Sequence, residues 1–314
     1  MSQDAKAPPA AQTAAPATGL PQPPRPGDLP EGLRLILAPN PSPLTGPGTN
    51  TFLLGREEIA VIDPGPDLAA HREAILAAAG RGRITHIFVT HAHRDHSEGV
   101  PALAAATGAQ VLGFGGALAG RSPIMQRLAA EGGAGGGEGL DMSFRPDRQL
   151  ADGETVDGAE WSLTAHHTPG HAGNHLSFEW GEATFSGDVV MGWSTTLISP
   201  PDGDLADYFR SLDRLTALAP ALLFPAHGPA IETPLPRLAE LAAHRRARTA
   251  QILSALRDGA PSDAAALATR IYDVPAHLLP AATRNVFAHL IALTTLGAAR
   301  PEGEITWQTR FSAD

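Results

Sequence analysis

The chain of 314 residues contains no cysteine, so it has neither a disulfide nor a thiolate ligand. Any metal ion it binds must therefore be held by histidine and carboxylate side chains. Aromatic residues make up only 5% of the sequence, and aliphatic residues must fill most of the core. Long apolar runs are also absent, and no stretch approaches the length that spans a bilayer. We therefore expect no membrane partner.

The first 30 residues contain no apolar stretch of the kind that a secretory signal requires. A cytoplasmic protein is the resulting expectation. This segment is rich in Ala, Pro and Gln and cannot build a core, so we expect residues 1–29 to be disordered.

Positive charge is scarce, because the net charge is −10 and Lys6 is the one lysine. Such a chain has no general affinity for polyanions. The charge is uneven, however. Residues 241–314 hold 8 Arg and 6 acidic residues, or +2, which leaves −12 on residues 1–240. The charge balance therefore neither favours nor excludes a nucleic-acid substrate.

The strongest signal in the sequence is a polar cluster at residues 90–96. It follows an apolar, β-branched run at residues 84–89, which predicts a buried strand. Side chains two positions apart on an extended segment share a face, so the first two histidines can point into one site. Imidazole and carboxylate groups suit Zn²⁺, Fe²⁺ or Mn²⁺. The cluster therefore predicts a metal site whose ligands are His91, His93, Asp95 and His96.

Three more candidate ligands repeat this pattern, in which a predicted strand ends and a donor stands in a tight turn. They are His171 in Thr-Pro-Gly-His, Asp188 in Ser-Gly-Asp and His227 in Pro-Ala-His-Gly. Neighbouring Gly and Pro residues let the backbone turn sharply and fix the side-chain direction. Each donor alone fits a turn residue, a cap or a loop histidine. Because open sheets place their sites at strand ends, the shared position predicts that all seven converge.

The rest of the chain alternates predicted strands and helices, which indicates an α/β protein with two sheets flanked by helices. Residues 113–140 are rich in glycine, and we expect a flexible excursion there. After a long helix from about Pro234 to Arg257, two helical patterns and a strand pair near Ala298–Thr306 predict a winged-helix-like module. The expected domains are residues 30–240, which are catalytic, and residues 241–314.

These residues resemble the metallo-β-lactamase superfamily over about residues 30–230, in all five of its usual motifs. Asp63 matches the first motif, His91-x-His93-x-Asp95-His96 the signature, and His171, Asp188 and His227 the remaining three. The resemblance implies an αββα sandwich with the site at one edge between the sheets. It also implies one metal on His91, His93 and His171, another on Asp95, His96 and His227, Asp188 between the two metals, and Asp63 supporting the site.

By this resemblance the chain is a dinuclear metal-dependent hydrolase. Two divalent ions about 3.5–4 Å apart share a water and lower its pKa toward ~7, which gives a metal-bound hydroxide at neutral pH. We expect two zinc ions, although the same donors accept Mn²⁺ or Fe²⁺. Asp95 and Asp63 are the candidate catalytic residues, Asp95 because its free oxygen can orient the hydroxide.

Within the superfamily the chain is similar to the glyoxalase-II-like group, and specifically to the lactamase-beta-2-like endoribonucleases. This similarity lies in residues 45–51, 187–196, 199–204 and 244–253 and in the C-terminal module. It implies cleavage of single-stranded RNA. One alternative is hydrolysis of a thioester or another small ester. Another is a mononuclear-iron sulfur dioxygenase, and a third is a nucleic-acid-binding module with a vestigial metal site.

Several other residues are open to two interpretations. Residues 192–204 are either a structural loop over the sheet edge or a wall of the substrate site. We expect Arg245, Arg246 and Arg248 to form a solvated or salt-bridged helix face rather than a phosphate clamp. His166, His167 and His175 flank His171, and we expect them to support the site or to lie on the surface.

Overall fold

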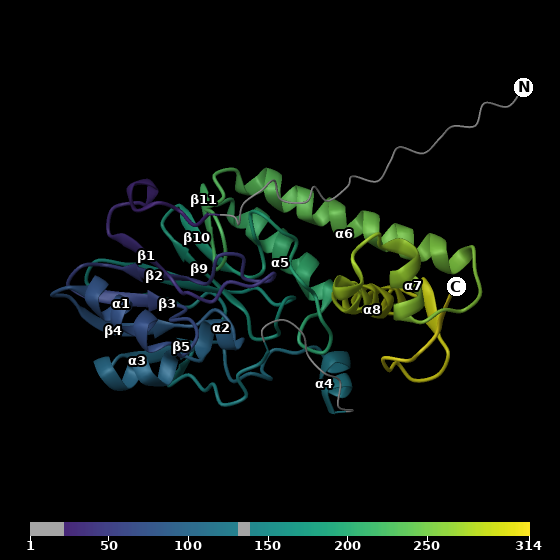
Figure 1. The fold of residues 1–314 in the computed structure, drawn as a ribbon, viewed down its shortest axis with the longest axis horizontal. Coiled ribbons are helices and arrows are strands. Elements are labelled where there is room, and N and C mark those ends of the chain that lie inside the picture. The colour runs from purple at the N-terminus through teal and green to yellow at the C-terminus, as the bar shows by residue number, and fades with distance from the viewer. Residues whose placement is uncertain (1–21, 131–138) are drawn as a thin grey trace, which may run out of the picture.

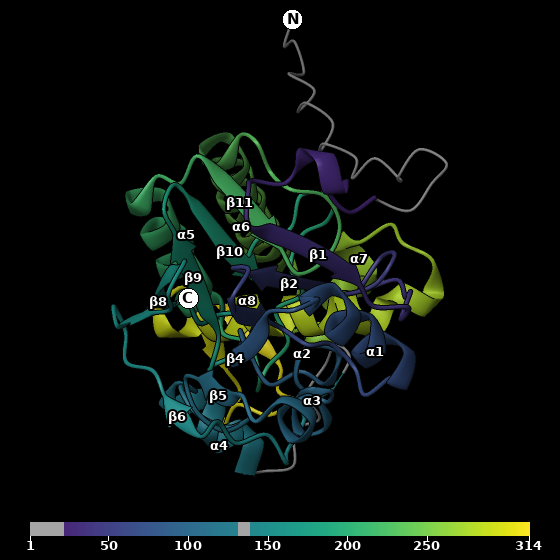
Figure 2. The ribbon, with the colours of Figure 1, turned by 90° about the vertical axis from the view of Figure 1, so that its left-hand side faces the viewer.

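Two β-sheets lie face to face at the centre of the protein, in a computed structural model that describes residues 22–130 and 139–314 (Figure 1). The first sheet has the order β1-β2-β3-β4-β5-β6, and its strands are Leu33–Leu37, Asn50–Leu54, Glu58–Ile62, Arg83–Phe88, Gln110–Gly113 and Arg148–Gln149. The second has the order β11-β10-β9-β8-β7, from Leu222–Pro225, Ala183–Gly187, Leu176–Trp180, Ser162–His167 and Thr155–Asp157. Figure 2 shows the two sheets from one end of the sandwich.

The strands at the centre of the first sheet are apolar on both faces because both faces are covered. In β3, Ala60 and Ile62 face the core between the sheets, while Ile59 and Val61 face the outer helices. Between the sheets, the ring of Phe52 lies 5.0 Å from that of Phe185, centroid to centroid. Burial of each such side chain stabilises the fold by about 1.5–3 kcal/mol.

Helices cover the outer face of each sheet, so the fold is the expected αββα sandwich. On the first sheet lie α1 (Ala69–Ala79) and α3 (Val100–Thr107), with the short α2 (Arg94–Ser97) between them in sequence. On the second lie α5 (Leu205–Leu218) and the first part of α6 (Pro234–Arg257). Two short 3₁₀ helices are also present, Pro26–Asp28 and Ala276–Leu278.

A small C-terminal module follows the sandwich, as expected. It consists of α7 (Ala264–Ile271), α8 (Leu279–Thr295) and a hairpin of β12 (Ala299–Pro301) and β13 (Phe311–Ala313). The second hairpin strand lies beyond the predicted Thr306, because Phe311 and not Ile305 pairs with Pro301. The end of α6 packs into this module, so the expected boundary at residue 240 falls inside a continuous helix (Figure 1).

The prediction of a flexible excursion over residues 113–140 was wrong for its middle part. Residues Pro123–Ala130 form α4, whose Met125 and Leu128 are buried in the hydrophobic cluster of the C-terminal module. Residues 131–138, which are part of that excursion, and residues 1–21, on which most of the expected N-terminal disorder falls, lie outside the described residues. Among the described residues, no helix combines the length and apolar character needed to cross a membrane.

Candidate metal centre

Seven donor side chains gather at one edge of the sandwich, and each of them follows a strand. The extended segment after β4 carries His91 and His93, and the first turn of α2 carries the next two. The turns after β8, β10 and β11 supply the other three. The structure therefore brings together all seven predicted donors, each at most 7% exposed: His91, His93, Asp95, His96, His171, Asp188 and His227.

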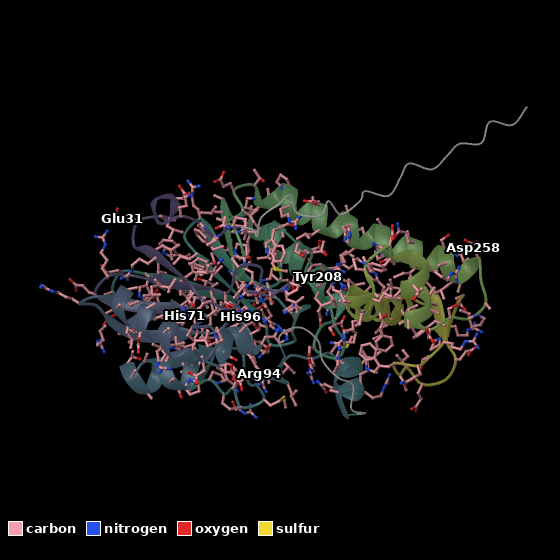
Figure 3. The ribbon with its side chains drawn as sticks, in the orientation of Figure 1. Glu31, His71, Arg94, His96, Tyr208 and Asp258 are labelled. Atoms are coloured by element: carbon pink, nitrogen blue, oxygen red, sulfur yellow. The ribbon has the colours of Figure 1, made fainter. Side chains whose placement is uncertain are left out.

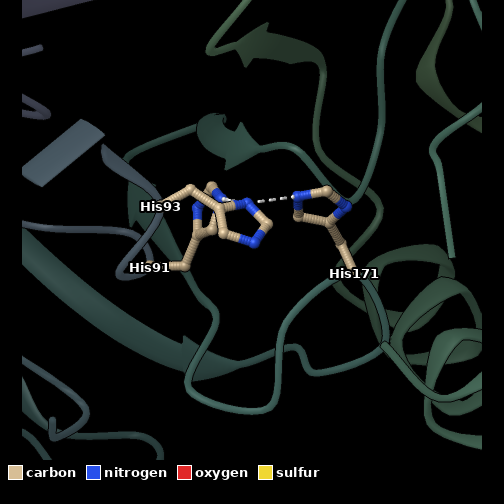
Figure 4. A group of neighbouring side chains, drawn as sticks. All are labelled: His91, His93 and His171. Carbon is tan, nitrogen blue, oxygen red and sulfur yellow. Dashed lines mark hydrogen bonds between the residues drawn. The ribbon is translucent and has the colours of Figure 1, made fainter. Parts of the chain in front are cut away.

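The first group of donors consists of three imidazoles, drawn in Figure 4. Nδ1 of His93 lies 2.9 Å from Nε2 of His91 and 3.0 Å from Nε2 of His171. Tetrahedral zinc with Zn–N distances of about 2.0–2.1 Å separates its nitrogen ligands by about 3.3 Å. The three nitrogens are therefore spaced as one cation requires.

The second group combines a carboxylate with two imidazoles. Oδ2 of Asp95 lies 3.4 Å from Nε2 of His96 and 3.3 Å from Nε2 of His227. Asp188 lies between the two groups. Its Oδ1 is 3.3 Å from Nε2 of His227, and its Oδ2 is 3.5 Å from Nε2 of His171. One carboxylate thus faces both groups, as a bridging ligand would.

Hydrogen bonds at the far side of the rings direct the lone pairs of four histidines into the centre. Nδ1 of His171 donates to the carbonyl of Leu197 at 2.8 Å, and Nδ1 of His227 donates to that of Gly48 at 3.1 Å. In the neutral form each of these imidazoles then keeps its one N–H on Nδ1 and its lone pair on Nε2, as metal ligation requires. Nδ1 of His91 and of His96 are held in the same way, by Thr90 and Asp63.

Asp63 lies behind the centre and not in it. Its Oδ2 accepts from Nδ1 of His96 at 2.8 Å and from the Thr90 hydroxyl at 2.7 Å, while its Oδ1 accepts from the Thr90 amide. Its backbone has φ of 51°, a left-handed conformation that costs about 1 kcal/mol for a residue other than glycine. These contacts are those of a positioning residue.

The two groups differ in their pKa shifts. Burial, followed by the neighbouring His171, lowers the pKa of His93 to about 3, and burial also holds the pKa of His91 well below its ordinary value. Burial works to lower the pKa of His227 as well, but the adjacent carboxylates of Asp188 and Asp95 outweigh it and raise that pKa to about 10. The second group therefore has a strong demand for positive charge, which a divalent cation would meet.

Unpartnered buried atoms also indicate a cation. Oδ1 of Asp95, Oδ1 of Asp188 and Nε2 of His96 are buried and have no hydrogen-bond partner among the described residues. Such atoms are costly unless a ligand satisfies them. The residues present therefore fit a pair of divalent cations.

A small open cavity lies over the centre. Five of the seven donors reach it, and the segment after Asp188 forms much of its wall. Of residues 192–204, part therefore lines the cavity, and Ile198 is buried in the hydrophobic cluster beneath α5 and α6. The other lining residues are Pro43, Leu44, Met191, Ser194, Thr195 and Leu197.

Two further side chains support the turns that carry the donors. His175, for which the sequence left a supporting or a surface position open, is fully buried, and its Nε2 accepts from the Asp188 amide at 3.1 Å. A side chain at Gly187 would lie 2.4 Å from that nitrogen, so only glycine fits there. Asn50, to which the sequence analysis gave no role, donates to the carbonyls of Pro225 and Gly228 and so holds the turn that carries His227. In the sequence, Asn50 lies within residues 45–51, a segment that had been used only for its similarity to the lactamase-beta-2-like group.

The prediction of a solvated or salt-bridged arginine face on α6 was wrong for Arg245, which is 2% exposed and bonds to other elements of the fold. Arg248 lies over the ring of Tyr272 instead. Two other histidines flank His171. His166 pairs with Glu179, whereas His167 donates to the carbonyl of Gly173 and stacks on the ring of Phe114.

The fold and its histidine-rich centre define an αββα metal-site protein, and comparison with known proteins gives its family. The family model described as the metallo-beta-lactamase superfamily matches residues 44–227, and that of the beta-lactamase associated winged helix domain matches residues 264–307. The chain belongs to the metallo-beta-lactamase superfamily and is a hydrolase of that superfamily. Its winged-helix module follows the sheets.

Individual relatives extend over most of the chain. A beta-lactamase-like protein 2 homolog of Drosophila melanogaster is 32% identical, over 84% of this chain and 88% of its own length. An atrochrysone carboxyl ACP thioesterase of Aspergillus fumigatus is 30% identical, over 71% of this chain and 64% of its own. A crystal structure of a metallo-beta-lactamase family protein from Thermus thermophilus matches with a TM-score of 0.71 and 26% identity, over 90% of this chain and 99% of that one.

Proposed function

We propose that the protein hydrolyses acyl thioesters, with two zinc ions held by the seven donors. His91, His93 and His171 hold one ion, Asp95, His96 and His227 hold the other, and Asp188 lies between them. When bound, two such ions supply an activated water and polarise the scissile carbonyl. The observation that carries the choice of substrate is the lining of the cavity.

The described lining contains Pro43, Leu44, Met191 and Leu197 and no arginine. A phosphodiester backbone is bound through Arg or Lys contacts that neutralise its charge. An acyl thioester needs no such contact at its reacting group, because the thioester is neutral and the acyl chain beside it can be apolar. The name of the thioesterase relative from Aspergillus fumigatus supports the same substrate class.

Asp95 has one oxygen left for chemistry. Its Oδ2 faces His96 and His227, while its buried Oδ1 has no hydrogen-bond partner among the described residues. That Oδ1 would accept a hydrogen bond from the attacking water and orient it toward the carbonyl. The side chains of Met191 and Leu197 would exclude bulk water from the acyl group.

The test is a parallel assay of the zinc-loaded protein on an acyl-glutathione thioester, an acyl-pantetheine thioester and a single-stranded RNA oligomer. Zinc and iron per chain are measured on the same sample. We expect thioester turnover that is lost in Asp188→Ala, about two zinc ions per chain, and intact RNA.

Cleavage of RNA that depends on Asp188, with both thioesters inert, would replace this proposal with the endonuclease that the subgroup resemblance implies. One iron per chain, with oxygen consumed during turnover, would replace it with the sulfur dioxygenase.

A further inference from the structure

Two arginines on one face of α6 reach the loop that carries Asp188. Arg237 donates from Nε to the carbonyl of Met191 at 2.9 Å and from Nη2 to that of Ser194 at 2.6 Å. Arg245, eight positions and just over two helical turns later, donates from Nη2 to the carbonyl of Thr196. The long helix that leads into the winged-helix module therefore holds this loop at three of its carbonyl groups.

Arg245 also joins the loop to α8. Its Nη1 donates to Oδ1 of Asn285 at 3.0 Å, and the same oxygen accepts from the backbone amide of Ile198 at 3.3 Å. The guanidinium lies 5.6 Å from the ring centroid of Tyr208, which Figure 3 labels where the sandwich meets the C-terminal helices. Asn285 and the buried Arg245 together fix the backbone on both sides of Leu197, Arg245 at Thr196 and Asn285 at Ile198.

That short stretch of backbone contacts two of the seven donors. The carbonyl of Leu197 accepts from Nδ1 of His171 and so directs its Nε2 toward the centre. The Thr196 hydroxyl donates to the Asp188 carbonyl at 2.8 Å. A shift of residues 196–198 would therefore turn the ring of His171 and displace the carboxylate that faces both groups of donors.

We propose that Arg245, with Asn285, is a positioning residue of the metal centre, through which the C-terminal helices hold His171 and Asp188 in ligating geometry. This inference rests on the proposed zinc site but not on the identity of the substrate. Neither residue touches the cavity, so their effect passes through the backbone of residues 196–198. Groups that orient a metal ligand typically change metal affinity by about 10–100-fold when they are removed.

The experiment measures zinc affinity of the full chain by competition with a chromophoric chelator, without reference to turnover. Arg245→Met keeps most of the side-chain volume and removes every donor. Arg248→Met is the matched control, because Arg248 lies one turn further along α6, bonds to Gln251 and does not contact the loop. We expect zinc binding to weaken about tenfold in Arg245→Met and to stay within about twofold of the unmodified protein in Arg248→Met.

A second pair of variants tests the inference independently if Arg245→Met does not fold. Asn285→Leu keeps the size of the side chain and loses the acceptor, whereas Asn285→Asp keeps the acceptor for Arg245 and for the Ile198 amide. We expect weaker zinc binding in Asn285→Leu and near-native binding in Asn285→Asp. If the Asn285 side chain only filled space, the two variants would bind zinc with equal affinity.

Native zinc affinity in a folded Arg245→Met, or equal affinities in the two Asn285 variants, would overturn the inference and leave the proposed function standing. Failure of the unmodified protein to bind zinc would overturn both the inference and the proposed function. Zinc binding by the unmodified protein is therefore measured first.

Discussion

The two halves of the metal centre are built from different donors and have opposite electrostatic character. The first half is three imidazoles, and burial lowers the pKa of two of them, His91 and His93, the latter to about 3. The second half contains the carboxylate of Asp95, and its carboxylate neighbours raise the pKa of His227 to about 10. The first half therefore offers lone pairs without charge, and the second offers charge as well. A cation would satisfy both halves, the first through its lone pairs and the second through its negative charge.

Asp188 is the residue that the two halves share, so its removal has the largest expected effect. In Asp188→Ala we expect thioester turnover to fall by about 10³-fold or more, as for loss of one member of a catalytic unit. Zinc per chain falls below one, because each half loses an adjacent oxygen. Turnover and metal content are measured together, with Asp213→Ala on the exposed face of α5 as the control. Near-native turnover in Asp188→Ala would remove the shared carboxylate from the mechanism.

Single ligand deletions in each half test whether the halves bind independently. We expect His93→Ala and His227→Ala each to retain about one zinc per chain, since each leaves the other half's donors in place. Turnover falls about 10²-fold in both, because activation of water and polarisation of the carbonyl need both ions. Metal analysis after gel filtration gives the stoichiometry. Loss of both ions in either variant would mean that the two halves bind metal as one unit and not independently.

The sequence was sufficient to predict this centre because its ligands obey a local rule. Each donor stands in a Gly- or Pro-containing turn, or in the motif at residues 90–96, directly after an apolar strand. Strand ends in such folds meet at one edge, so seven local patterns converge without further information. Short apolar runs likewise predicted the strands of both sheets, apart from the short β6 and β7.

Features that depend on distant contacts were not predictable in the same way. Arg245 lies in a run of arginines whose pattern is typical of a solvated helix face. It is buried because Thr196 and Asn285, from other elements of the fold, bond to it. The many glycines near α4 favoured a flexible segment in the sequence, but α4 forms a short helix. Its Met125 and Leu128 pack against a module more than 120 residues later in the chain. In both cases the partner, and not the local pattern, decides the structure.

Asp63 contacts only one half directly, so its substitution should affect the halves unequally. In Asp63→Asn the amide can direct an N–H toward Nδ1 of His96, which disfavours the tautomer that ligates through Nε2. Asparagine tolerates the left-handed backbone at this position, so the fold is retained. We expect one zinc to bind about 10–100-fold more weakly and the other to bind as in the unmodified protein. Competition titration with a chelator distinguishes this result from equal weakening at both sites, which would contradict the asymmetry.

Removal of zinc gives the smallest expected effect, a change in thermal stability. A ligand that binds only the folded state at ten times its Kd stabilises that state by about 1.4 kcal/mol. For a chain of this size we expect each ion to raise Tm by about 2 °C under that condition. Because the halves are separate, His93→Ala and His227→Ala should each show about half of the shift that the unmodified protein shows on chelation, measured by a thermal scan with and without chelator. A full shift in either variant would mean that one half alone couples metal binding to folding.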